Sequence, residues 1–154
     1  MTINSDAPAV SRKEIRIEAS PVEVWAVHAD INAWSDWNAD ISASRLHGDL
    51  VPGAVFEWES NGMGITSTLE VVEPGRRIGW TGRARGTQAR HLWILEKDGD
   101  GTIIRTEESL EGWMTKLLRR QVQRAMDTSL DAWLQDLKTE VEMNAGNGNG
   151  SGEE

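Results

Sequence analysis

The chain has 154 residues and a formal net charge of −9, from 16 Lys and Arg against 25 Asp and Glu. Its length fits one domain with its own hydrophobic core. The acidic balance argues against nucleic acid as a principal partner, because phosphate binding needs a basic surface. The absence of Cys excludes disulfides and thiol catalysis, and no window reaches the roughly 18 consecutive apolar residues of a membrane span. With no signal-peptide pattern at the N-terminus, we expect a cytoplasmic protein without integral membrane association.

The aromatic residues are almost all tryptophan: the chain has eight Trp, one Phe and no Tyr. Trp is the bulkiest side chain, and its ring N–H needs a hydrogen-bond partner when it is buried. So many indoles either fill a large interior or line one.

The first part of the chain predicts a strand followed by a capped helix. We expect residues 1–11 to be disordered, and the alternation within residues 12–19 predicts a strand. Ser20 is then a helix N-cap, Pro21 takes the first helical position, and Glu23 closes a capping box.

A second short helix or turn is predicted over residues 32–40, after which short β-prone segments alternate with turns. The turn signals are Pro52-Gly53, Asn61-Gly62, Pro74-Gly75, Gly86 and residues 98–101. This spacing is typical of an antiparallel meander. Five turns join six strands, so the first strand brings the sheet to seven.

One long helix, residues 113–143, is predicted to close the domain. Its apolar stripe consists of Leu118, Val122, Ala125, Ser129, Leu130, Trp133, Leu134, Leu137 and Val141. Such a stripe needs a sheet face to pack on. We therefore expect a single domain over 12–143 and a disordered, acidic, Gly- and Asn-rich tail over 144–154.

Five segments in this order carry a resemblance to a known superfamily. They are SPVEVW (20–25), WSDWN (34–38), EPGRRIGW (73–80), the segment 91–112 and WLQDLKTEVE (133–142). Together they resemble the START-like, Bet v 1-like (SRPBCC) superfamily, and within it the bacterial polyketide cyclase/dehydrase and lipid-transport family. The resemblance covers about residues 12–142.

The resemblance implies an α+β helix-grip fold. In this fold a seven-stranded curved antiparallel sheet wraps around the long C-terminal helix, and two short helices follow the first strand. The space between the sheet and the helix is filled by side chains or occupied by a ligand. Alternation within strands assigns to the inner face Phe56 and Trp58; Met63, Ile65, Ser67 and Leu69; Ile78 and Trp80; His91, Trp93 and Leu95; and Ile104, Thr106, Glu108 and Leu110. The predicted ligand-binding residues are Trp58, Ile65, Ser67, Trp80, Trp93, Thr106, Met126 and Trp133.

Three inward ionisable residues, His28, His91 and Glu108, are the candidate catalytic groups. Where His28 stands, the family usually has an aliphatic residue, so Glu108 or a ligand is expected to bond its imidazole. The competing interpretation is a core histidine satisfied by a backbone carbonyl or by solvent, with His91 as a polar cavity wall. For Glu108, an exposed or misregistered position competes with a ligand-facing one.

Motifs of other enzyme classes are absent from the sequence. It has no G-x-S-x-G elbow, no phosphate loop and no H-E-x-x-H helix. A two-histidine, one-carboxylate metal site built from His28, His91 and Glu108 rests only on inferred placement. We therefore expect no metal and no cofactor.

Three functions follow from this reading. The favoured one is binding of a small hydrophobic or aromatic molecule, lipid or polyketide-like, in the cavity. The second is a polyketide cyclase or dehydratase that uses the cavity His and Glu as acid–base groups. The third is a protein-interaction or chaperone-activator-like module that uses either the outer face of the sheet or the basic first half of the last helix, which contains Lys116, Arg119, Arg120 and Arg124. The simpler explanation of these basic residues is that they form a solvent-exposed helix face.

The oligomeric state is a separate question. Strand edges and exposed indoles are compatible with a homodimer.

The choice between a filled and a hollow interior depends on Trp58, Trp80 and Trp93, the indoles on inward strand faces. If the three meet one another, the interior is full. If they stand apart, it contains a pocket.

Overall fold

The computed structural model describes residues 1–149 of the chain. In chain order its elements are β1 (Ala9–Ile17), α1 (Pro21–His28), the 3-10 helix η1 (Ile31–Ala33), α2 (Trp34–Trp37), β2 (Ile41–His47), β3 (Val55–Ser60), β4 (Met63–Glu73), β5 (Arg77–Ala84), β6 (Thr87–Asp98), β7 (Gly101–Glu111), α3 (Trp113–Leu117) and α4 (Arg119–Asn149). The strands form one antiparallel sheet in the order β1-β7-β6-β5-β4-β3-β2. The predicted seven-stranded α+β fold is confirmed.

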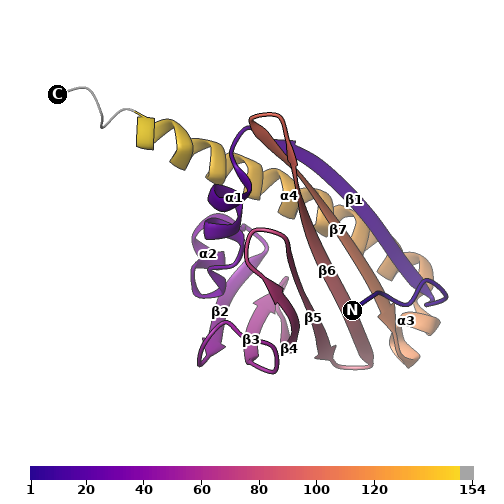
Figure 1. The fold of residues 1–154 in the computed structure, drawn as a ribbon. Helices are drawn as coiled ribbons and strands as arrows, with labels where there is room; N and C mark the ends of the chain where they lie inside the picture. Colours follow the sequence, from indigo (N-terminus) through magenta and orange to yellow (C-terminus); the bar gives the residue numbers. More distant parts are fainter. Residues whose placement is uncertain (150–154) are drawn as a thin grey trace.

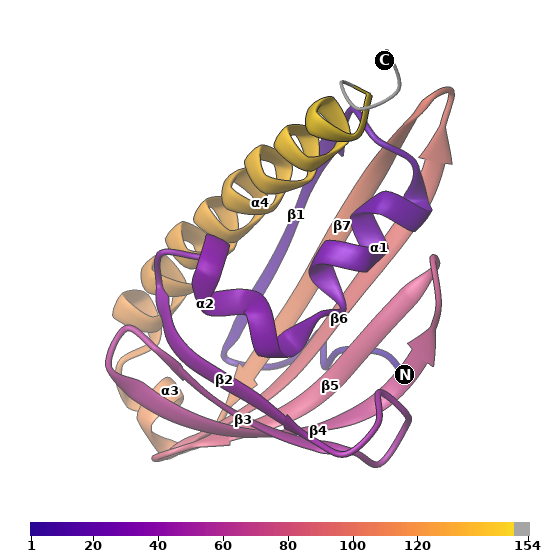
Figure 2. The same cartoon turned by 90° about the vertical axis from the view of Figure 1, so that its left-hand side faces the viewer.

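The sheet curves around α4, which lies across its concave side, and α1 and α2 cover the same side (Figures 1 and 2). The register shifts between Ile41 and Ala43 in β2 and between Leu69 and Val71 in β4. Such irregularities bend a strand and increase its twist. They lie in the half of the sheet that folds over toward α2, so they help to close the interior on that side.

The start of α1 is held by the predicted capping box. The Ser20 hydroxyl accepts from the Glu23 backbone N–H at 3.3 Å, and the Glu23 carboxylate accepts from the Ser20 backbone N–H at 2.8 Å. Two backbone donors that the first helical turn leaves without partners are thereby satisfied.

The N-terminal segment lies against the outer face of the sheet, which differs from the expected disorder over residues 1–11. β1 begins at Ala9, and the backbone N–H of Asn4 donates to Ser109 Oγ at 3.0 Å. Arg90 Nε donates to the Thr2 carbonyl oxygen at 2.8 Å, and Ile3 is buried. These partners are more than 80 residues away in sequence, so local composition gave no sign of them.

The C-terminal helix also differs from its predicted bounds. It is interrupted at Leu118, which separates α3 from α4, and α4 continues to Asn149 rather than ending at residue 143. Ala145 packs against the main core cluster, which extends the helix into the predicted tail. Residues 150–154 of that tail lie outside the described chain. None of the helices within residues 1–149 is both long and apolar enough to cross a membrane.

The inward strand faces are those that alternation predicted. Phe56, Leu69, Ile78, Trp93 and Ile104 are all buried, at 0–1% exposure, in one core cluster with the second half of the α4 stripe, which consists of Trp133, Leu134, Leu137 and Val141. The register expected for β3 to β7 is therefore confirmed. Leu118, predicted to be part of that stripe, is exposed, because the helix is interrupted there.

Trp133 of α4 is the centre of this core. Its ring centroid lies 5.1 Å from that of Trp34, 5.2 Å from Trp93 and 5.7 Å from Trp58. Aromatic pairs at such separations stabilise a fold by about 0.5–1.5 kcal/mol each beyond the area that they bury. The long helix, the sheet and α2 are thus joined through one side chain.

His28 is buried within the same rings, with its centroid 4.2 Å from that of Trp93. Neither of its ring nitrogens has a hydrogen-bond partner within residues 1–149. Burial, followed by repulsion from His91, lowers the pKa of His28 from 6.5 to about 3. The expectation that Glu108 bonds this imidazole is wrong, because Glu108 pairs with His91 instead.

His28 makes stability depend on pH. Below about pH 6.5 the unfolded chain takes up a proton at His28, whereas the folded protein does not until about pH 3. The unfolding free energy should therefore fall by about 1.4 kcal/mol per pH unit between these limits on account of His28, and should show no such contribution above them.

Substitution of His28 separates this charge effect from the cost of an unpartnered polar group. His28→Leu and His28→Gln should both remove the part of the pH dependence of the unfolding free energy that is due to His28. Only His28→Leu should also raise the unfolding free energy at pH 7.5, by about 1–3 kcal/mol. Urea unfolding at pH 4.5 and 7.5 measures both quantities. An unchanged slope in both variants would contradict this account.

Gly112 permits the tight junction between β7 and α3. It has φ 109°, and a Cβ there would collide with the carbonyl oxygen of Gly86 in the β5–β6 turn. That oxygen accepts from the Met114 backbone N–H at 3.1 Å, which fixes α3 to the turn.

Gly112→Ala should therefore destabilise the protein by more than Gly99→Ala. Gly99 also has positive φ, but open space surrounds its Cβ position. The control substitution should cost about 1–2 kcal/mol, from backbone conformation alone, and Gly112→Ala should exceed it because the collision is added. Equal unfolding free energies for the two variants would contradict the close approach.

Candidate functional site

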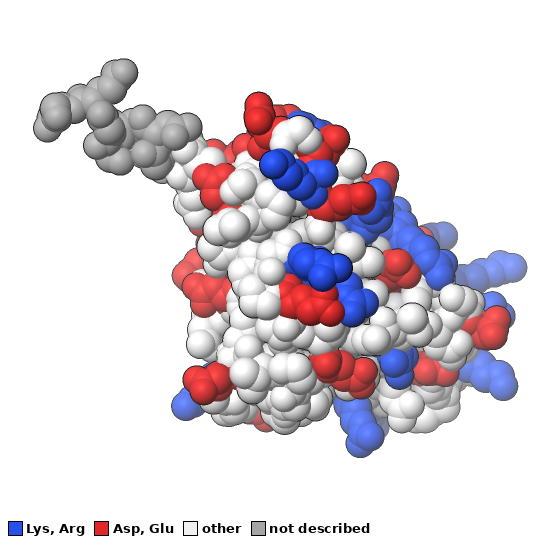
Figure 3. Space-filling view, in the orientation of Figure 1, with Lys and Arg blue, Asp and Glu red and all other residues white. Residues whose placement is uncertain are grey.

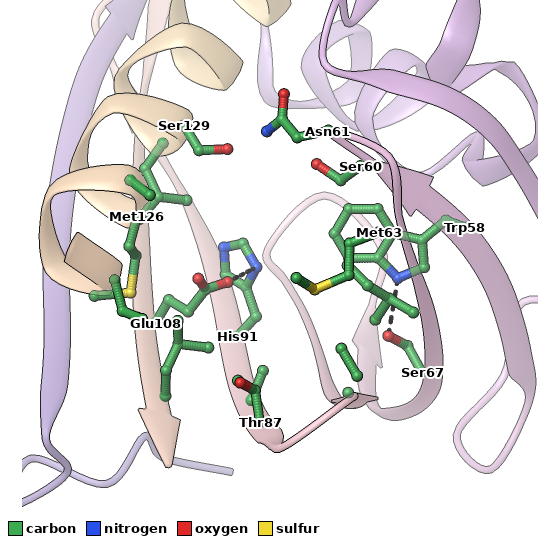
Figure 4. A pocket seen from close by; sticks show the side chains of 18 of the residues that line it. Trp58, Ser60, Asn61, Met63, Ser67, Thr87, His91, Glu108, Met126 and Ser129 are labelled. Carbon is green, nitrogen blue, oxygen red and sulfur yellow. Dashed lines mark hydrogen bonds and ion pairs between the residues drawn. The ribbon is translucent and has the colours of Figure 1, made fainter. Parts of the chain in front are cut away.

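A cavity of about 290 Å³ lies between the inner face of the sheet and the first part of the C-terminal helices. Strands β3 to β7 form one side and α3 and α4 form the other (Figure 4). This volume is close to the lower end of the range of small-molecule pockets, about 300–1,000 Å³. The walls are mainly apolar, with a few polar groups from β4, β6 and β7.

Small residues on two neighbouring strands create the hollow. After Trp80, the inward positions of β5 are Gly82 and Ala84, and the facing position on β6 is Ala89, which pairs with Gly82. Beyond the bulky Trp80, the inner faces of these two strands therefore carry only small side chains, which leave an unfilled space above them. The sequence showed this change in the alternation Trp80, Gly82, Ala84, but only the bulky positions were considered in the prediction.

The indoles divide the interior into a filled part and a hollow part. Trp58, Trp80 and Trp133 line the cavity, whereas Trp93 is wholly buried among the rings beside His28. Trp133 contacts each of the three inward strand indoles, with centroids at 5.2–6.4 Å. The interior is therefore full beside α1 and α2, and hollow toward α3.

Most of the predicted site residues are brought together at this cavity. Those that line it are Trp58, Ile65, Ser67, Trp80, His91, Glu108, Met126 and Trp133. Three do not: His28 and Trp93 lie in the filled part, and Thr106 is buried behind His91. Their assignment to the cavity wall was wrong because alternation gives the face of a strand residue but not its position along the interior.

Glu108, His91 and Thr106 form a connected polar group. Glu108 Oε2 lies 2.7 Å from His91 Nδ1, at an angle bent away from a linear hydrogen bond. On the other side of the ring, His91 Nε2 lies 2.8 Å from Thr106 Oγ1. The Glu108 side chain is 16% exposed and His91 only 1%, so the carboxylate is the member that the cavity reaches most readily (Figure 4). Glu108 therefore lies on the inward face of β7 at the cavity wall, and its register is as expected.

Polar side chains also mark the opening of the cavity. Asn61, at φ 51°, and Gly62 form the β3–β4 turn, and both take the positive φ typical of an Asn-Gly hairpin. Asn61 lies across from Ser129 of α4 (Figure 4). Deeper in the wall, Trp58 Nε1 donates to Ser67 Oγ at 3.0 Å, so this indole is held in place. Sequence reasoning did not identify Asn61 or Ser129 as site residues, because Asn61 was interpreted only as a turn signal and Ser129 only as part of the helix stripe.

The remaining charged groups lie outside the cavity. Arg119, Arg120 and Arg124 border a shallow, open depression with Asp127 and Asp131. In Figure 3, Lys and Arg gather toward the right-hand edge, on the side where Figure 1 places α3. Within residues 1–149, no three His, Asp or Glu side chains are grouped so that they could hold a metal ion. The interaction role of the basic residues stays a prediction.

Comparison with known proteins agrees with this fold. The sequence matches the family described as polyketide cyclase / dehydrase and lipid transport over residues 8–142. No curated protein matches it.

Similar folds occur among solved structures. A hypothetical protein from Helicobacter pylori has a TM-score of 0.81 at 24% identity, covering 90% of this chain and 91% of its own. The Zhui aromatase/cyclase from Streptomyces sp. R1128 has a TM-score of 0.76 at 16% identity, covering 88% and 94%. A START superfamily protein from Mycobacterium smegmatis has 0.67 at 16%, covering 87% and 97%. At these identities the likeness concerns the fold alone. The match over residues 8–142 shows that the chain belongs to the polyketide cyclase/dehydrase and lipid-transport family.

Proposed function

We propose that the protein binds a small, largely apolar molecule, aromatic or lipid-like, in the cavity between the sheet and α4. The observation that carries this proposal is a hollow of about 290 Å³ left beside a densely packed indole core. On the other side of Trp133, side chains fill the corresponding space. Three indoles and several aliphatic side chains instead face the hollow, which is the lining typical of pockets for apolar ligands.

The indoles that line the cavity favour a flat ligand. Trp58 and Trp80 line it from the sheet and Trp133 lines it from the helix. Indole faces make good contacts with planar, apolar molecules. Met63, Met114 and Met126 also line the cavity, and their flexible side chains can adapt to the outline of a guest. We therefore choose compounds with two fused aromatic rings as probes.

A cavity-filling substitution tests the proposal. Ala89→Leu adds three carbon atoms on the inner face of β6, and it should weaken binding of 2-methylnaphthalene at least tenfold in isothermal titration calorimetry. Gln88→Leu is the matched control, because Gln88 is the neighbouring residue and is exposed on the opposite face. Its affinity should equal that of the unaltered protein. Absence of binding by the unaltered protein, or equal weakening in both variants, would contradict the proposal.

A second candidate function, acid–base catalysis of the cyclase or dehydratase kind, is favoured by the Glu108–His91–Thr106 group. A carboxylate backed by an imidazole can take a proton from a carbon acid and, once it is protonated, deliver that proton to a leaving hydroxyl. Neither nitrogen of His91 is directed to the cavity alone, because each faces a protein partner. Glu108 is therefore the group we assign to proton transfer, and His91 is a positioning residue. His28 is not part of this candidate, because it lies in the filled core.

Turnover by variants decides this second candidate. With a linear poly-β-ketone thioester as substrate, Glu108→Gln should lower kcat by about 10² to 10⁴, the usual contribution of a general acid–base group. His28→Leu should leave kcat within a factor of about three, because that ring does not reach the cavity. Equal kcat for Glu108→Gln and the unaltered protein would remove the enzymatic interpretation while leaving ligand binding in place.

A further inference from the structure

The ionisable groups that face the cavity all come from one pair of side chains. Among the lining residues of the described chain, Glu108 and His91 are the ionisable ones, and neither Lys nor Arg is present. The basic residues near α3 and the start of α4 border a different, outer depression. A guest inside the cavity therefore meets no basic side chain other than an imidazole that a carboxylate already faces.

The pair cannot supply a net positive charge while Glu108 is ionised. With a neutral imidazole the two side chains carry a charge of −1, and with an imidazolium they carry zero. An anionic group placed beside them would lose its hydration and gain no opposite charge, which is strongly unfavourable in an apolar surrounding. The cavity therefore disfavours carboxylates and phosphates at its polar wall.

The same geometry leaves one hydrogen-bond acceptor for a guest. Oε2 of Glu108 faces His91 Nδ1, which leaves the second carboxylate oxygen, Oε1, to accept from a molecule in the cavity. The Thr106 hydroxyl can donate to His91 Nε2, which leaves Nδ1–H of the neutral ring beside Glu108 Oε2, 2.7 Å away at a bent angle. In this arrangement the imidazole lies against one carboxylate oxygen, and the other oxygen lacks a donor. In Figure 4, Glu108 is drawn beside His91, with Met126 on one side and Met63 and Trp58 beyond His91 on the other.

We propose that the cavity selects apolar molecules that carry one N–H or O–H donor, an alcohol, a phenol or an amine, and rejects the corresponding acids. Glu108 accepts from the donor, and His91 and Thr106 position Glu108. This inference rests on the proposed function, because it names the chemical class of the ligand for the same cavity. It adds that charge sign, and not apolar area alone, decides which molecules bind.

A matched set of four compounds tests the proposal: 2-methylnaphthalene, 2-naphthylmethanol, 2-naphthylmethylamine and 2-naphthoic acid. They share the two-ring body and differ in the head group. The alcohol and the amine should bind at least tenfold more tightly than the hydrocarbon, and the acid at least tenfold more weakly. Tenfold corresponds to about 1.4 kcal/mol, which is within the usual range for hydrogen bonds to charged groups. Calorimetric titration of the full chain gives the four affinities.

The Glu108→Gln variant assigns the preference to the carboxylate. It should bring all four affinities to within about threefold of one another, and an unfolding midpoint in urea like that of the unaltered protein shows that the variant is folded. Glu107→Gln is the matched control, because Glu107 is the next residue of β7 and pairs with Arg12 on the outer face. With Glu107→Gln, the affinities of the four compounds should be the same as those of the unaltered protein.

Thr106 tests the positioning step. Thr106→Val removes the hydroxyl that contacts His91 Nε2 and should reduce the ratio of alcohol affinity to hydrocarbon affinity, whereas Thr106→Ser should restore it. A merely structural role would change both affinities together and leave their ratio constant.

The outcomes separate this inference from the proposed function. If the hydrocarbon binds, and the acid binds as tightly as the alcohol in the unaltered protein, the head-group preference is overturned and apolar ligand binding stands. If none of the four compounds binds to the folded protein, both fail. Tighter binding of the amine than the alcohol identifies the preferred donor as a cation, and the reverse identifies it as a neutral hydroxyl; each supports the proposal.

Discussion

The packing of Trp133 against the rings of the sheet is the contact on which the rest of the structure depends. A single indole of α4 meets Trp34 from α2, Trp58 from β3 and Trp93 from β6 at centroid distances of 5.1–5.7 Å. These contacts set how far α4 stands from the concave side of the sheet. On one side of Trp133, aromatic rings fill the space between α4 and the sheet. On the other side, α4 is held at the same distance from the sheet, but the sheet carries small residues there. The cavity thus follows from a fixed helix–sheet distance combined with a change in side-chain size.

The two histidines of the interior have opposite physical consequences. His28 is enclosed by rings without a partner, so it stays neutral and lowers stability as the pH falls. His91 lies at the wall of the cavity, where Glu108 and Thr106 contact its two ring nitrogens. The first imidazole is part of the core, and the second supports a carboxylate that a guest can reach. Two histidines that looked alike in sequence therefore have different roles.

Much of the fold could be predicted from the sequence, because its signals are local. The Ser20 capping box and the alternation of β3 to β7 depend on residues a few positions apart, and both are confirmed. The ordered N-terminal segment could not be predicted, since Asn4 finds its partners at Ser109 and Glu111. The same holds for the extension of α4, which follows from the packing of Ala145 on the core.

The sequence predicts which face of the sheet each candidate site residue occupies, but not where along the interior the residue lies. Alternation placed Trp80, His91, Trp93 and Glu108 inside, yet it could not tell which of them adjoin the hollow. That distinction depends on the pairing of Gly82 with Ala89 across two strands, which is a matter of register rather than of either strand alone. The pairing of Glu108 with His91 rather than His28 has the same origin, since the two residues are direct neighbours across β6 and β7.

The position of a bound ligand tests the central claim most directly. Anomalous diffraction from crystals of the protein with 6-bromo-2-naphthol locates the bromine without assumptions about the ligand's shape. We expect one strong signal inside the cavity, on the α3 side of Trp133, with the naphthol hydroxyl within hydrogen-bond distance of Glu108. A signal confined to the outer depression beside Arg119 and Arg124, or one that replaces rings of the core around His28, would contradict the division of the interior into a filled and a hollow part.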